Sequence, residues 1–148
     1  MVPARQNRPS SDSSSASWVL SPAALKGILM NTPLYSPERR LLCELSRAAL
    51  EVERGGTDWQ TLDIRLSAWC QSFGTDPQPA QHQIEFSLQQ LKQRTLDAEQ
   101  FPTYPTAWLV GFTKIDADRY QVEPSPWLSA NLVQLACIIK LQDIYDTL

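Results

Sequence analysis

Apolar and polar positions alternate along most of this chain with the period of a helix. Between residues 59 and 73 an apolar residue recurs every three or four positions, at Trp59, Leu62, Leu66, Trp69 and Phe73. This spacing places all of the apolar side chains on one helix face. Similar stripes run through residues 37–54, 80–99 and 126–146, and a shorter one covers residues 22–30. The pattern therefore predicts about five amphipathic helices.

Serine, proline and glycine mark the expected helix ends. A serine oxygen can accept a hydrogen bond from a first-turn N–H, and proline fits the first helical position, where no donor is needed. Three such pairs occur, at Ser21-Pro22, Ser36-Pro37 and Ser125-Pro126. Thr57 and Gln60 have the spacing of a capping box, so we expect the third helix to begin after Thr57. Gly74 is its expected stop.

One segment departs from the helical period. Residues 108–115 are mostly apolar, the polar turn Asp116-Ala117-Asp118 follows, and residues 119–122 complete a predicted β-hairpin. We therefore expect a mainly α fold, a compact helical bundle of about five helices with a β-hairpin in the C-terminal half. The expected core consists of Leu45, Trp59, Leu66, Trp69, Leu88, Leu91, Leu132, Leu135 and Ile139.

The first 17 residues differ in composition from the rest of the chain. They hold six serines and two prolines and little to bury, which predicts a flexible leader over residues 1–17. The whole chain has 148 residues, of which 43% are hydrophobic and 20% charged. These values are typical of a globular chain, so we expect residues 18–148 to form a single helical domain.

The residues for catalysis or metal binding are sparse. His82 is the only histidine, and Cys43, Cys70 and Cys137 have no metal-ligand spacing. The sequence has no glycine-rich phosphate loop. We therefore expect no enzyme activity, metal or cofactor. Unpaired cysteines and the lack of a signal peptide or an apolar run of about 18 residues indicate a cytoplasmic protein without a membrane span.

Five basic residues are candidates for contact with nucleic-acid phosphates. Arg40 and Arg47 are seven residues apart on one expected helix face, and Arg39 lies off that face. Lys92 and Arg94 lie beside a run of glutamines. Basic and amide side chains together suit phosphate and base-edge contacts. The net charge of −3 opposes tight binding, so we expect weak, sequence-independent binding by the isolated chain. A solvated face with intrahelical ion pairs remains the alternative.

A helical block after the serine-rich leader MVPARQNRPSSDSSSAS resembles the small subunit of CRISPR effector complexes of the type I-D branch. In that family the small subunit can be made from an internal start within the large-subunit gene, and the leader is similar to such a product. The resemblance implies a non-catalytic subunit of an antiviral, RNA-guided complex. It also implies other protein subunits, guide RNA or target DNA backbone as partners, with several copies side by side.

Two other classes of function remain open. In a winged-helix DNA-binding protein, the third and fourth helices and the hairpin would form a helix-turn-helix and its wing. Its base-reading residues would be Gln81, Gln83 and Gln89, and Lys114 and Arg119 on the wing would hold phosphates. In a protein-binding adaptor, such as a phage assembly factor, the same apolar helices would serve without any nucleic acid.

Overall fold

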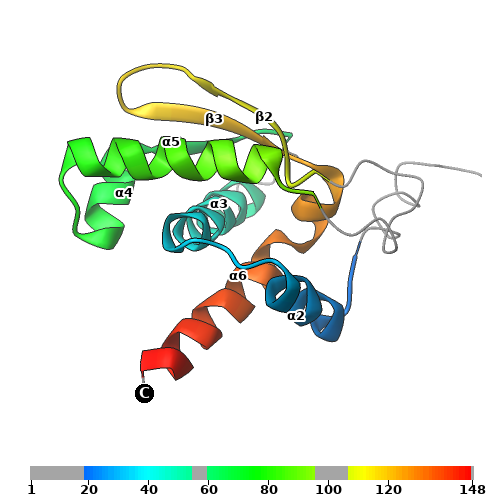
Figure 1. Cartoon of the computed structure of the whole chain (residues 1–148). Helices are drawn as coiled ribbons and strands as arrows, with labels where there is room; N and C mark the ends of the chain where they lie inside the picture. Colours follow the sequence, from blue (N-terminus) through cyan, green and yellow to red (C-terminus); the bar gives the residue numbers. More distant parts are fainter. Residues whose placement is uncertain (1–18, 55–59, 96–106, 148) are drawn as a thin grey trace, which may run out of the picture.

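The computed structural model describes residues 19–54, 60–95 and 107–147 (Figure 1). The expected leader over residues 1–17, the Thr57 cap and Trp59 lie outside these residues. Within the described part, no helix is long and apolar enough to cross a bilayer.

The predicted mainly helical architecture with a C-terminal-half hairpin is confirmed. The described residues hold five helices: α2 (Pro22–Asn31), α3 (Ser36–Arg54), α4 (Leu66–Phe73), α5 (Pro77–Gln93) and α6 (Pro126–Thr147). The Ser21 hydroxyl accepts a hydrogen bond from the Ala24 N–H at 3.1 Å, as the Ser-Pro pattern predicts. Helices α2, α3 and α6 begin and end within a residue of their predicted bounds.

The third predicted helix is wrong over its first half. Leu62–Arg65 forms a strand, β1, and the helix begins only at Leu66. Leu62 and Ile64 are buried while Asp63 and Arg65 are exposed, which is the period of a strand. Pairing with a neighbouring strand supplies the backbone hydrogen bonds that a longer helix would have made.

The fourth predicted helix, Ala80–Glu99, is displaced toward the N-terminus. Helix α5 includes Pro77 and Pro79 in its first turn, where a missing N–H costs nothing. After α5 ends, Thr95 forms an isolated antiparallel bridge with Ala107. The pairing of these two residues explains why the described chain leaves the helix before residue 95.

The predicted hairpin is present and belongs to a larger sheet. Strands β2 (Leu109–Lys114) and β3 (Arg119–Pro124) are antiparallel, and β1 pairs antiparallel with the other edge of β3. The sheet order is therefore β1-β3-β2. In the turn, the Asp118 N–H donates to the Asp116 carboxylate at 2.9 Å, a local bond typical of aspartate in turns.

Helix α3 lies at the centre of the molecule and contacts α5, β1 and α6 (Figure 1). The buried side chains form one hydrophobic cluster, in which Trp69, Trp108 and Trp127 are fully enclosed. Seven predicted core residues are buried: Leu45, Trp69, Leu88, Leu91, Leu132, Leu135 and Ile139. Leu66 is only half-buried at the edge of this core.

Candidate nucleic-acid interface

Helices α4 and α5 form a helix-turn-helix. Only Gly74, Thr75 and Asp76 separate them, and Gly74 adopts a left-handed conformation with φ 63°. The N–H groups of Gly74 and Thr75 both donate to the Cys70 carbonyl, which closes α4. A short turn containing glycine is typical of this motif.

Hydrogen bonds between side chains hold the two helices and α3 together. The Trp69 indole N–H donates to the Gln83 side-chain oxygen at 2.9 Å. The same oxygen lies 3.4 Å from Nη1 of Arg40, and the Arg40 guanidinium lies 5.0 Å from the centre of the Phe73 ring. Gln83 and Arg40 therefore join α3, α4 and α5. These contacts fix the orientation of α5 relative to α3 and α4.

Helix α5 is covered on two flanks and open on a third. It packs against α3 and α4 on one side and against β2 on another (Figure 1). The open flank carries exposed side chains spaced three or four residues apart, which we call the solvent stripe: Gln78, His82, Phe86, Gln89 and Gln93. In the described part of the chain, the side chains of Gln78, Gln89 and Gln93 make no hydrogen bond to another residue.

The solvent stripe carries no carboxylate. The one acidic residue of α5 is Glu85, which accepts a hydrogen bond from the Tyr120 hydroxyl at 2.6 Å and lies 3.8 Å from the Lys114 ammonium. The bond from Tyr120 holds the pKa of Glu85 below its ordinary value. Its charge is therefore engaged with the hairpin. The exposed acid near the stripe is Asp76, the N-cap residue of α5, which lies two residues before Gln78 and makes no side-chain cap hydrogen bond.

Arg94, one of the five candidate phosphate-binding residues, lies in an ion pair with a buried acid. Its Nε and Nη2 donate to the two carboxylate oxygens of Glu38 at 2.6 and 2.8 Å. Glu38 has no exposed surface, and the guanidinium is mostly covered. The hydrogen bonds to Glu38 raise the pKa of Arg94 above its ordinary value. Arg94 therefore joins the end of α5 to the start of α3.

The other four candidates do not form one surface with it. Arg39 pairs with Asp143 on α6 at 2.6 Å. Arg47 pairs with Glu44 and Glu51 on its own helix, as the salt-bridged alternative predicts. Lys92 is exposed, with its ammonium 5.7 Å from the Phe112 ring. Of the candidates Arg39, Arg40, Arg47 and Lys92, only Lys92 lies on α5. It belongs to the last turn of that helix.

Arg39 and Arg40 share a second feature, a cavity of about 470 Å³ that Lys140 also lines. Cys43 contributes a thiol to its wall, and burial raises the pKa of that thiol. Asp143 also lines this cavity and pairs with Arg39, so its carboxylate offsets part of the positive charge of Arg39, Arg40 and Lys140.

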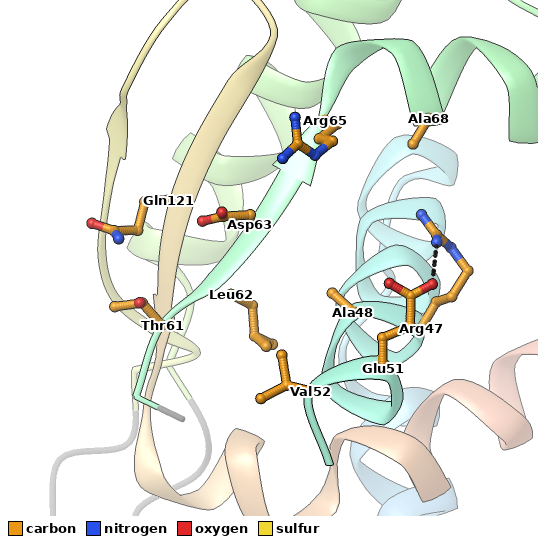
Figure 2. Close-up of a pocket in the computed structure, with 10 residues that line it drawn as sticks. All are labelled: Arg47, Ala48, Glu51, Val52, Thr61, Leu62, Asp63, Arg65, Ala68 and Gln121. Carbon is orange, nitrogen blue, oxygen red and sulfur yellow. Dashed lines mark hydrogen bonds and ion pairs between the residues drawn. The ribbon is translucent and has the colours of Figure 1, made fainter. Parts of the chain in front are cut away.

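Figure 2 shows the groove in which Arg47 lies, between α3, β1 and α4. Its volume is about 490 Å³, and Arg47, Glu51, Asp63 and Arg65 line it. Arg47 bonds Glu51 at 3.1 Å, and Arg119 lies 3.5 Å from Asp63. The charges alternate in sign and compensate one another, so this groove offers no uniform field for an anion.

The residues expected on a wing are also paired within the molecule. Arg119 bonds Asp63 and approaches Asp116 at 3.9 Å. Asp118 accepts bonds from the Ser67 N–H and hydroxyl at 2.8 and 3.1 Å. The tip of the hairpin therefore lies against the start of α4 and is acidic.

Of the three glutamines expected to read bases, the structure leaves one facing solvent without an internal partner. Gln83 is used inside the molecule, as described above, and Gln81 donates to Glu85 at 3.2 Å. Gln89 is exposed on the solvent stripe.

Phe86 is a candidate contact residue that the spacing of apolar positions did not indicate. This side chain is 41% exposed, and its ring packs edge-on against Tyr35 at 5.5 Å between centroids. The available signal was its position, because Phe86 falls between Ile84 and Leu88 and hence off the apolar stripe of α5.

The order α3-β1-α4-α5-β2-β3 with sheet order β1-β3-β2 is that of a winged helix. A solved structure supports this class. The chain resembles the WH1 domain of MSBI1.176, described as a replication protein isolated from a multiple sclerosis patient. The TM-score is 0.57 at 15% identity, over 78% of this chain and 95% of that one. At this identity the likeness concerns the fold. No protein-family model and no curated protein sequence matches the chain.

Proposed function

We propose that this chain is a winged-helix DNA-binding protein whose helix α5 enters the major groove of duplex DNA. The observation that carries the proposal is the solvent stripe, with free amide groups and no carboxylate, on the second helix of a helix-turn-helix. A major groove about 12 Å wide admits one α-helix. The likeness to a domain of a replication protein supports DNA as the partner. In this proposal the chain acts in the cytoplasm without a metal, a cofactor or catalysis.

Few free cations are available for phosphate contacts. Arg39, Arg47 and Arg94 are each paired with a carboxylate, and the net charge is −3. Affinity that rests on few phosphates is modest and depends weakly on salt. The hairpin in this proposal braces α5 through Tyr120 and Glu85 instead of gripping the backbone.

The fold favours this interpretation over the CRISPR small subunit. The likeness to a winged-helix domain bears on DNA binding and not on guide RNA or neighbouring subunits. The CRISPR interpretation and its partners therefore stay a prediction, and no contact in the described residues argues for them.

The test is binding of the full chain to fluorescein-labelled duplex DNA, followed by anisotropy over a range of salt concentrations. We expect log affinity to fall linearly with log salt, and Lys92→Glu to make the slope shallower by about 0.9 for the lost phosphate contact. Lys26→Glu is the matched control, since Lys26 is an exposed lysine on α2, and Figure 1 shows helix α2 apart from α5. No binding to any duplex at low salt, or equal effects of both reversals, would contradict the proposal.

A further inference from the structure

We propose that α5 selects A·T base pairs, with Gln89 bonding adenine and Phe86 contacting the methyl group of a thymine. This inference rests on the proposed function and names the bases that the solvent stripe recognises. It concerns two neighbouring side chains, because residues three apart lie side by side on a helix.

Gln89 has the chemistry and the freedom to bond adenine. Its amide offers one acceptor and two donors, and it makes no hydrogen bond within the described residues. In the major groove adenine presents the N7 acceptor and the N6 amino donor, which a glutamine can satisfy together. Guanine presents two acceptors at these positions, so the glutamine oxygen would face another acceptor.

Phe86 supplies an apolar surface beside this amide. Exposure of an aromatic ring to water is unfavourable, and its burial against an apolar group lowers the free energy. Phe86 is the one such ring on the otherwise polar solvent stripe. The thymine C5 methyl is the apolar group that the major groove presents. Cytosine lacks this methyl and presents an amino group, so Phe86 favours thymine over cytosine.

The ring of Phe86 is held in place before any DNA arrives. It packs edge-on against Tyr35, whose backbone N–H donates to the buried Glu38 carboxylate at 2.9 Å. The Arg94 guanidinium lies 5.9 Å from the centre of the Tyr35 ring. The buried ion pair of Glu38 and Arg94 therefore supports the reading face through Tyr35. Side chains fixed in this way lose little freedom on binding.

The charge of the stripe agrees with a DNA edge as its occupant. The electronegative major-groove edges of adenine and thymine would be repelled by a free acid, and the stripe has none. Glu85, the acid nearest in sequence, is bonded to Tyr120 and lies 3.8 Å from Lys114.

The experiment uses the full chain and base analogues. Duplexes with a randomised centre are selected by binding, and an enriched duplex is then remade with single bases replaced. We expect A·T pairs in the enriched sequences. Replacement of one thymine by uracil, which lacks the methyl, should weaken binding about fourfold. Replacement of an adjacent adenine by 7-deazaadenine, which lacks N7, should weaken it about fivefold or more.

Two variants assign each effect to its side chain. Gln89→Ala should bind adenine and 7-deazaadenine duplexes equally, and Phe86→Ala should bind thymine and uracil duplexes equally. Gln134→Ala is the matched control, since Gln134 is an exposed glutamine on α6 and should keep both discriminations. The analogue measurements on the unaltered chain do not depend on how the variants fold.

Three outcomes would contradict the inference that α5 selects A·T pairs. Enrichment of G·C pairs, or binding indifferent to uracil and 7-deazaadenine, would overturn the A·T inference and leave the proposed function standing. Discrimination that survives in both variants would assign the reading to other residues and overturn it as well. If no duplex is bound at all, the proposed function fails and this inference fails with it.

Discussion

Glu38 is the residue whose surroundings differ most from what its type suggests. It is an acid with no exposed surface, and it accepts two hydrogen bonds from Arg94 and one from the Tyr35 N–H. The last of these satisfies a backbone donor at the start of α3, which is the usual task of an acid in a first turn. One carboxylate thus fixes a helix start, an interhelical contact and the aromatic side chain beside Phe86.

Removing this acid should destabilise the chain strongly. Glu38→Ala leaves the Arg94 guanidinium in a mostly covered position without its partner, and breaking a buried pair costs about 3–5 kcal/mol. Glu51→Ala is the control, since the Glu51 side chain is 63% exposed and its pair with Arg47 contributes less than about 1 kcal/mol. Denaturant unfolding measures both, and equal losses would contradict the structural role of Glu38.

Glu85 should make stability depend on pH on the acid side. Its pKa in the folded chain lies below the ordinary value of 4.5, mainly because the Tyr120 hydroxyl donates to the carboxylate. The unfolded chain therefore binds the proton first as the pH falls, and this contribution to stability is present above pH 4.5 and lost below it.

The change Tyr120→Phe removes the hydroxyl and keeps the ring, so it tests this linkage. We expect the stability of the variant to fall less between neutral and acid pH than that of the parent, by less than about 1 kcal/mol because Glu85 is partly exposed. Denaturant melts at a series of pH values measure the difference. Parallel pH profiles for the two proteins would show that the bond does not favour the charged carboxylate.

Among the individual elements, the turn between α4 and α5 needs a glycine for its backbone conformation, whereas the glycine in α2 has no such requirement. Gly74 has φ 63°, which disfavours any side chain, whereas Gly27 lies within a helix. An added Cβ would meet no atom within 4 Å at either position. Substitution by alanine at these positions therefore isolates the conformational preference of the backbone from packing.

The two substitutions should have opposite signs. Gly74→Ala should lower the free energy of unfolding by about 1–2 kcal/mol, because a left-handed conformation is costly for alanine. Gly27→Ala should raise it by about 0.5–1 kcal/mol, because alanine loses less freedom in a helix. Thermal unfolding of both variants measures the signs. Destabilisation by Gly27→Ala would mean that the interior of α2 is constrained by something other than helix propensity.

At the scale of the whole molecule, a single cluster joins every helix and strand of the described residues. Trp69 belongs to it with no exposed surface, and its ring packs edge-on against Phe73 at 4.9 Å. A common core predicts one cooperative unfolding transition.

Trp69→Ala should lower the stability of the full chain by about 3–5 kcal/mol, since it opens a large cavity and also leaves Gln83 without the indole donor. The loss should be the same by circular dichroism and by the fluorescence of the remaining tryptophans. A loss below about 1 kcal/mol would remove Trp69 from the core, and two separate transitions would divide the molecule into independent parts.

Features that depend on neighbours along the chain could be predicted from the sequence. The helix start at Ser21, the turn at Asp116 and the buried faces of α3, α5 and α6 follow from local spacing, because capping and amphipathicity act over a few residues. The start of α6 after Ser125 also agrees with the Ser-Pro pattern, although the Ser125 hydroxyl donates to the Trp108 carbonyl. The remaining features depend on contacts between elements that are distant along the chain. Leu62–Arg65 became a strand because β3 offered an edge nearly 60 residues later. Arg94 and Arg39 pair with acids that are 56 and 104 residues away along the chain. These arginines are therefore engaged within the molecule, whereas Gln89 and Phe86 are exposed. The pairs of Arg47 with acids of its own helix follow from spacing along the chain. Charge pairing between elements acts through space, so that spacing does not reveal which other polar groups remain available.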